Sequence, residues 1–157
     1  MKLLQTSLLA VSTMLWSATS FTASEFDQYL QQKQIIDRQY KIQQKTELNE
    51  MLSVLSAEDS KTLPLQIDQN TIIEQLNLSA DKTVLKGLII TPDFAQFEQD
   101  LGRKEVLKMI RHNLLNNCAI FFEHEYQRVN PYTVELELSS ENNQYEVEIK
   151  QIDCKTK

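Results

Sequence analysis

Two runs of alternating apolar and polar residues near the C-terminus constrain the fold of this chain most strongly. Residues 132–138 and 145–149 carry apolar side chains at every second position and polar or charged ones between them. Side chains on one face of a β-strand recur with this period of two residues. Because the short polar segment 140–143 joins the runs, they predict a β-hairpin with one apolar face and one charged face.

The register of this hairpin predicts two facing pairs of carboxylates. With the turn centred on residues 141–142, Glu137 faces Glu146 and Glu135 faces Glu148. Like charges directly opposite one another on a sheet are unfavourable. The charged face is therefore either fully solvated or in contact with something basic: the chain's own N-terminal segment, a cation or a basic partner. These four glutamates are candidate partner contacts.

The first 24 residues predict a cleavable secretory signal peptide. A positive start at Lys2 precedes the apolar stretch 3–18, and small residues allow cleavage after Ser20 or after Ser24. A retained membrane anchor is the alternative, but the stretch contains several polar residues and is short of the roughly 20 apolar residues that a span needs. We expect a periplasmic or secreted protein with no stable membrane span after cleavage.

The charge of the chain argues against one class of partner. With 16 basic and 22 acidic residues, the formal net charge is −6 at pH 7. An acidic protein repels phosphate backbones. We therefore expect no nucleic-acid partner.

Two cysteines, Cys118 and Cys154, are present. Export permits a disulfide, and an even count fits one bridge. Closing a loop of this length is worth roughly 4 kcal/mol in the loop-entropy model. The close C-x-x-C spacing of redox or metal-binding pairs is missing, so the sequence predicts a structural Cys118–Cys154 disulfide.

Residues 24–55 predict a long amphipathic helix. No Gly or Pro interrupts this run, and most of its apolar residues fall on one stripe at 100° per residue. Only Ile35 and Ile42 fall on the far side, which makes them candidate partner contacts. The polar residues in this part of the run include Lys33, Arg38, Lys41 and Lys45. Over residues 25–45, the helix either packs on its own domain or extends as an arm toward a partner.

The order of the remaining elements indicates the fold class. A polar linker, 56–62, precedes extended segments at 63–68, 71–78 and 83–91, and amphipathic helical patterns follow as far as residue 122. We predict an α+β fold: a mainly antiparallel sheet of about four strands packed on helices and preceded by the long N-terminal helix. The expected division is a signal peptide (1–24), a helical arm and linker (25–62) and an α+β domain (63–157).

No catalytic or cofactor motif stands out in the chain. His112 and His124 lack converging partners at metal-ligand spacing, no serine lies in a glycine-flanked elbow, and the glycines form no phosphate loop. We therefore expect neither an enzyme nor a bound cofactor or metal.

Residues 63–154 resemble a small disulfide-bonded domain of bacterial periplasmic proteins. The similarity rests on the pair 63–64, the pair 67–68 and Thr71 before a hairpin, on Cys118 in a helix, and on a final hairpin that closes at 152–154. The resemblance implies an oxidised, envelope-located α+β domain, and members of this group are largely uncharacterised. Small disulfide-bonded α+β domains also serve as pilotins and assembly factors of secretion machines, which typically carry a lipobox cysteine that this chain lacks.

The sequence favours a non-catalytic envelope accessory protein that acts through contact with an envelope protein partner. One alternative is a binding module for a small apolar or lipid-like ligand, held between Val84, Leu88 and Ile90 and a helix carrying Phe94 and Phe97. The other is a hydrolase whose site is assembled from dispersed residues, with a histidine beside a carboxylate and a hydroxyl.

Overall fold

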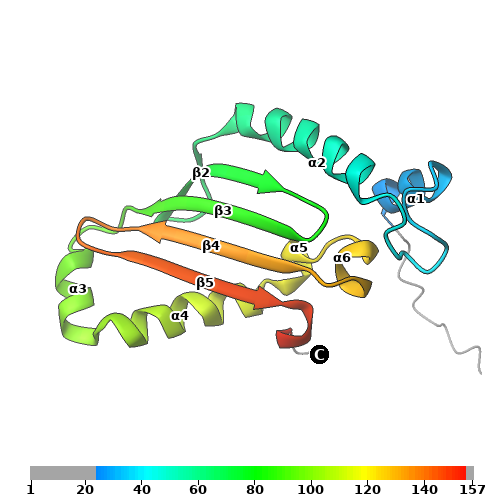
Figure 1. Cartoon of the computed structure of the whole chain (residues 1–157). Helices are drawn as coiled ribbons and strands as arrows, with labels where there is room; N and C mark the ends of the chain where they lie inside the picture. The colour runs from blue at the N-terminus through cyan, green and yellow to red at the C-terminus, as the bar shows by residue number, and fades with distance from the viewer. Residues whose placement is uncertain (1–23, 155–157) are drawn as a thin grey trace, which may run out of the picture.

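The computed structural model describes residues 24–154, and Figure 1 shows the arrangement of their helices and strands. The helices are α1 (Glu25–Gln32), α2 (Lys45–Asp59), α3 (Phe94–Leu101), α4 (Arg103–Asn116), α5 (Cys118–Phe121) and α6 (Glu125–Val129), with short 3-10 helices η1 (Ser60–Thr62) and η2 (Gln151–Asp153). The strands are β1 (Leu65–Gln66), β2 (Thr71–Leu78), β3 (Lys82–Ile89), β4 (Thr133–Ser139) and β5 (Gln144–Lys150). The predicted signal peptide lies outside the described residues except for Ser24.

The five strands form one sheet in sequence order, β1-β2-β3-β4-β5. β3 and β4 are parallel, and the other neighbouring strands are antiparallel. The predicted α+β class is confirmed, whereas the sheet is mixed and has five strands where about four were expected. The parallel pair arises because the chain passes from β3 through α3 to α6 before it enters β4, and parallel neighbours need such a long crossover. Figure 1 shows α2 along one edge of the sheet, beside β2, and α4 along the other, beside β5.

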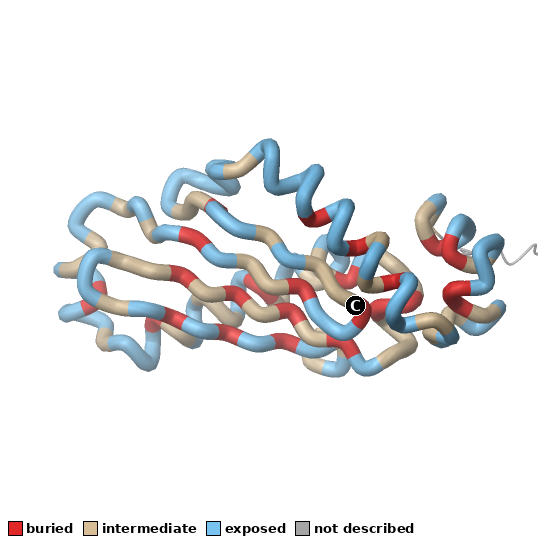
Figure 2. Tube along the Cα trace, turned by 45° about the horizontal axis from the view of Figure 1, so that its top comes forward, coloured by how far each residue is buried: buried red, intermediate tan, exposed pale blue. Residues whose placement is uncertain are grey.

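The predicted hairpin is formed by β4 and β5. Its pairs are Glu135 with Glu148 and Glu137 with Glu146, which is the register expected from the sequence. Figure 2 shows buried residues alternating with intermediate ones along β4 and with exposed ones along β5. Their buried side chains are Val134, Leu136, Leu138, Tyr145, Val147 and Ile149, and all belong to the hydrophobic core between sheet and helices.

The single long N-terminal helix that the sequence predicts is not formed. α1 ends at Gln32 and α2 begins at Lys45, with a folded loop between them. In this loop Gln34 and Tyr40 have positive φ angles of 59° and 62°. Ile35 and Ile36 are 5 % and 1 % exposed, and adjacent residues of a continuous helix point about 100° apart. Breaking the helix buries both.

The loop between α1 and α2 is held by hydrogen bonds to the rest of the chain. The Asn130 side-chain amide donates to the carbonyl of Tyr40 (2.8 Å), and its oxygen accepts from the backbone N–H of Ile42 (3.2 Å). Ile36 and Ile42 form an isolated antiparallel bridge. These bonds fix a backbone that local preference alone does not favour.

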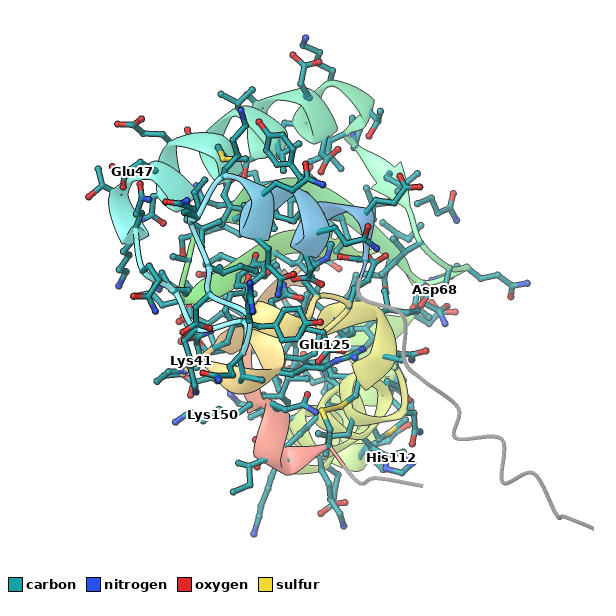
Figure 3. All side chains as sticks on the ribbon, turned by 90° about the vertical axis from the view of Figure 1, so that its right-hand side faces the viewer. Lys41, Glu47, Asp68, His112, Glu125 and Lys150 are labelled. Atoms are coloured by element: carbon teal, nitrogen blue, oxygen red, sulfur yellow. A yellow bond between two sulfur atoms is a disulfide. The ribbon has the colours of Figure 1, made fainter. Side chains whose placement is uncertain are left out.

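α1 packs on α6 at one end of the molecule. Leu30 of α1 is fully buried in the same core as Leu48 of α2 and Tyr126 of α6. Figure 3 views this end and shows α1 over α6, which begins at the labelled Glu125. Residues 25–45 therefore pack on the protein and do not extend as a free arm.

The segment predicted as a polar linker, 56–62, is helical. α2 continues to Asp59 and η1 follows directly. Ser56 is buried, and its hydroxyl accepts a hydrogen bond from the backbone N–H of Leu78 in β2 (2.8 Å). The residues before β1 are thus bonded to the sheet.

The predicted disulfide between Cys118 and Cys154 is present. It joins the start of α5 to the residue after η2, so that it ties the end of the sheet's last strand to the helical layer. No helix within residues 24–154 has the length and apolar composition to cross a membrane.

Gly87 in β3 lies where no side chain fits. A Cβ at this position would lie 2.2 Å from the carbonyl oxygen of Ile72 in β2. The register of β2 against β3 shifts between Ile73 and Gln75, and this irregularity adjoins the close approach. The glycine therefore permits the β2–β3 contact.

Candidate interaction surface

The face of the sheet opposite the core carries a group of charged side chains, which we call the charged face. On β5 every second residue is exposed, and β3 and β4 contribute the residues that share this side in the observed register. The charged face consists of Lys82 and Lys86 of β3, Glu135 and Glu137 of β4, and Glu146, Glu148 and Lys150 of β5. The four glutamates predicted as partner contacts are thus brought together.

The carboxylates of β4 are paired with lysines of β3. Lys82 Nζ lies 3.1 Å from Glu135 Oε1, and Lys86 Nζ lies 2.7 Å from Glu137 Oε2. Compensation by the N-terminal segment is therefore the wrong interpretation: in that segment Lys45 forms an ion pair with Asp81 instead (2.9 Å). The hydrogen bond from Lys45 lowers the pKa of Asp81 below its usual range.

The carboxylates of β5 are compensated less completely. Glu148 pairs with Lys150 of the same strand at 3.3 Å, and both side chains are more than half exposed. Glu146 has no ion-pair partner among the residues that the structure describes. Exposed pairs of this kind are worth about 0–1 kcal/mol. The four glutamates line a depression of about 410 Å³. Lys104, Lys108 and Arg111 of α4 line a neighbouring depression with Glu146 and Glu148, so the β5 carboxylates lie near basic side chains with which Glu146 forms no ion pair.

The outer edge of β5 is closed by two arginines of α4. Arg103 donates to the carbonyl of Gln144, and Arg111 donates to the carbonyl of Glu148. Arg111 also pairs with Asp153 at 3.1 Å. Because unpaired carbonyls of an edge strand are acceptors for another strand, these arginines hinder strand addition at β5.

The apolar cleft proposed for a small ligand is not formed by the residues expected to line it. Val84 pairs in register with Glu135 and Leu88 with Ser139, so both lie on the charged face. Phe94 of α3 packs on the other side, edge-on against buried Tyr145 at 6.1 Å. The predicted cleft is therefore wrong for Val84 and Leu88, whereas Ile90 and Phe94 do line a depression of about 470 Å³, together with polar residues such as Asp93 and Glu141.

A buried polar contact lies below α3. Tyr145 donates a hydrogen bond to the buried carboxylate of Glu98. Burial and this hydrogen bond raise the pKa of Tyr145 to about 12. Burial also raises the pKa values of Tyr126 and Tyr132, and Tyr132 shares a hydrogen bond with Thr83 at 2.8 Å. All three tyrosines are buried, and Tyr132 also lines a depression at the start of β4.

Of the two predicted isoleucine contacts, neither is displayed to a partner. Ile35 is buried in the core. Ile42 is half-buried and packs against the core. The loop instead exposes Lys33, Arg38 and Lys41, of which Lys41 donates to the carbonyl of Val129.

One histidine lies beside a carboxylate and a hydroxyl, the combination required by the dispersed-hydrolase alternative. His124 Nδ1 is 2.8 Å from Ser24 Oγ, and Ser24 Oγ donates to Asp27 Oδ2 at 2.7 Å. The order differs from a Ser-His-Asp triad, because the hydroxyl lies between imidazole and carboxylate, whereas a triad places the imidazole in the middle. Asp27 is completely buried and accepts from the backbone N–H of Glu125 at 2.9 Å. The cluster caps helices and offers no activated nucleophile.

His112 and a depression at the start of β4 are further candidate sites. His112 is exposed on α4, and Figure 3 shows it at the surface. A depression of about 750 Å³ lies at the start of β4, where Lys82, Glu135 and Lys150 line it together with exposed Ile152. Within residues 24–154 no three His, Cys, Asp or Glu side chains form a group that could hold a metal ion.

Sequence reasoning found the glutamates of the charged face but missed the side chains that surround them. Lys82 and Lys86 are four residues apart, which places both on one face of a strand. This spacing is visible in the sequence, but it predicts ion pairs with the glutamates only when β4 is known to lie beside β3. Arg103 and Arg111 give no such signal, since their acceptors are backbone carbonyls 41 and 37 residues away.

Comparisons with known proteins show similarity of fold alone. No protein-family model matches the chain, and no curated protein matches it. A protein from Pseudomonas aeruginosa that is assigned as secreted superposes with a TM-score of 0.51 at 10 % sequence identity, over 71 % of this chain and 96 % of that chain. The pilotin EpsS of the Vibrio vulnificus type 2 secretion system gives a TM-score of 0.48 at 11 % identity, over 72 % of this chain and 96 % of that one. The similarity to the Pseudomonas protein agrees, at the level of fold, with the resemblance found in the sequence.

Proposed function

We propose that this chain is an exported, non-catalytic accessory protein of the cell envelope, which acts by binding another protein through its charged face. The observation that carries the proposal is the alignment of Glu146 and Glu148 beside Glu135 and Glu137 on the exposed side of the sheet. Facing carboxylates lower the stability of a hairpin. Because these facing carboxylates cost stability, their presence on the charged face favours a role in binding for this face.

The location in the envelope is supported by two features. The N-terminal sequence has the pattern of a signal peptide. The Cys118–Cys154 disulfide is typical of proteins from oxidising compartments. We therefore place the protein in the periplasm or outside the cell.

The chemistry of the charged face indicates a partner with basic side chains. Lys82 and Lys86 already form ion pairs with the carboxylates of β4, whereas Glu146 forms no ion pair among the described residues, although Lys104 and Lys108 of α4 line a depression with it. Opposite charges across an interface raise association rates and set orientation. Binding to the charged face should therefore weaken as ionic strength rises.

Charge reversal tests this proposal. The tagged mature protein is used to capture partners from an envelope extract, beside a double variant, Glu146→Lys with Glu148→Lys. The control variant, Glu47→Lys with Glu50→Lys, changes the net charge equally on the exposed surface of α2. We expect the β5 variant to lose at least tenfold of the captured partner while the α2 variant retains it. Equal capture by both variants, with all three proteins folded, refutes the role of the charged face.

A further inference from the structure

We infer that the precursor is cut between Ser20 and Phe21 and not after Ser24, so that Ser24 belongs to the working protein. This inference rests on the export part of the proposed function and is independent of the charged face. The sequence permits both cuts, because small residues precede each of them. The contacts of Ser24 distinguish the two.

Ser24 is the N-cap of α1. Its carbonyl accepts the first hydrogen bond of the helix, from the N–H of Gln28 at 3.1 Å. Its hydroxyl accepts from the N–H of Asp27 at 3.1 Å and donates to Asp27 Oδ2 at 2.7 Å. The backbone and side chain of Ser24 therefore both hold the first turn of α1.

Ser24 also joins α1 to a distant part of the chain. Its hydroxyl lies 2.8 Å from Nδ1 of His124, the N-cap residue of α6. Asp27, which Ser24 holds in place, accepts from the N–H of Glu125 at 2.9 Å. The ring of Phe26 packs on His124, with 5.1 Å between the ring centroids. Ser24, which cleavage after this residue would remove, is thus part of the contact between α1 and α6.

Cleavage after Ser24 would undo this arrangement. It would remove the cap, the contact with His124 and the acceptor for Gln28. It would also leave a positive α-ammonium group on Glu25 at the first position of α1, where the helix dipole disfavours positive charge. Cleavage after Ser20 hydrolyses the Ser20–Phe21 peptide bond instead: the C–N bond breaks, the oxygen of water joins the Ser20 carbonyl carbon to form a carboxylate, and the Phe21 nitrogen takes up the protons to become an ammonium group. The cap then remains, three residues from the new end.

The mass of the exported protein decides between the cuts. The full-length precursor is expressed in a bacterium, and the intact mass of the periplasmic product is measured. We expect the mass of residues 21–157. The mass of residues 25–157 overturns the inference and leaves export standing. An uncut precursor overturns both the inference and the exported part of the proposed function, whereas the partner role is judged separately by the capture assay.

Matched leucine variants test the site of cleavage directly. A bulky residue directly before the cut blocks signal processing. In a pulse-chase experiment, Ser20→Leu should accumulate uncut precursor, and Ser24→Leu should be processed at the rate of the wild type. The opposite pattern overturns the inference.

Thermal unfolding supplies a second measurement. Purified chains that begin at Phe21 and at Glu25 are compared, and the shorter chain should melt about 3–8 °C lower because it lacks the cap. Equal melting temperatures contradict the argument from the contacts of Ser24.

Discussion

Removing the carboxylate of Asp27 should release α1 from the rest of the protein. This carboxylate is completely buried and accepts hydrogen bonds from Ser24 Oγ (2.7 Å) and from the N–H groups of Glu125 (2.9 Å) and Tyr126 (3.5 Å). The last two are the first N–H groups of α6, which have no partner within their own helix. In the Asp27→Ala variant both lose their acceptor.

The magnitude follows from these contacts. Loss of a helix cap costs about 0.5–2 kcal/mol, and a buried donor left without a partner costs about 1–3 kcal/mol. The bond to Tyr126 is long and contributes little, and relief from burying a charge offsets part of the cost. We expect a loss of about 2–4 kcal/mol in the free energy of unfolding, which for a domain of this size lowers the melting temperature by about 7–14 °C.

The measurement is thermal and urea unfolding of the mature protein followed by circular dichroism. Asp27→Asn keeps one acceptor oxygen and should lose about half as much stability. Glu25→Ala, in the same turn of α1 but exposed, is the matched control and should change stability by less than about 0.5 kcal/mol. If Asp27→Ala unfolds at the same temperature as Glu25→Ala, α1 is not held by this carboxylate, and residues 25–45 regain the role of a separable arm.

Three further predictions concern the sheet and its ends. Gly87→Ala should destabilise the protein by more than about 2 kcal/mol, because its Cβ would meet the backbone of β2 at 2.2 Å; an unchanged urea midpoint contradicts the close approach. Replacing both Cys118 and Cys154 by serine should cost about 2–4 kcal/mol, and reduction of the wild type should lower its melting temperature to a similar extent; a wild type insensitive to reduction argues against a stabilising bridge. The double variant Arg103→Ala with Arg111→Ala should form dimers or larger species in size-exclusion chromatography, because the carbonyls of β5 become free for another strand; a strictly monomeric variant shows that the arginines are not needed to protect this edge.

The hairpin shows why part of this fold is visible in the sequence. Its register, with Glu137 opposite Glu146, follows from alternation and turn length, which act within 20 residues. β2 likewise spans Thr71–Leu78, the bounds that its composition predicts. Local patterns determine such elements because each strand must turn one face to a core.

The loop between α1 and α2 shows where local patterns fail. Residues 33–44 contain neither Gly nor Pro, and their spacing of apolar residues allows a helix. The structure instead breaks the helix, because burial of Ile35 and Ile36 and the hydrogen bonds of Asn130 outweigh the preference of the local backbone. Asn130 lies about 90 residues from the loop, so no local pattern contains this information.

The sequence by itself determined the α+β class, the hairpin and its facing glutamates, and the pairing of the two cysteines. Only the tertiary structure decided that β3 lies parallel to β4, so that Lys82 and Lys86 meet Glu135 and Glu137. It also decided that α1 is fixed to α6. The physical reason is the separation of the interacting residues along the sequence. Periodicity and turns depend on residues that are close in sequence. Strand pairing, buried caps and ion pairs depend on distant residues that only folding brings together.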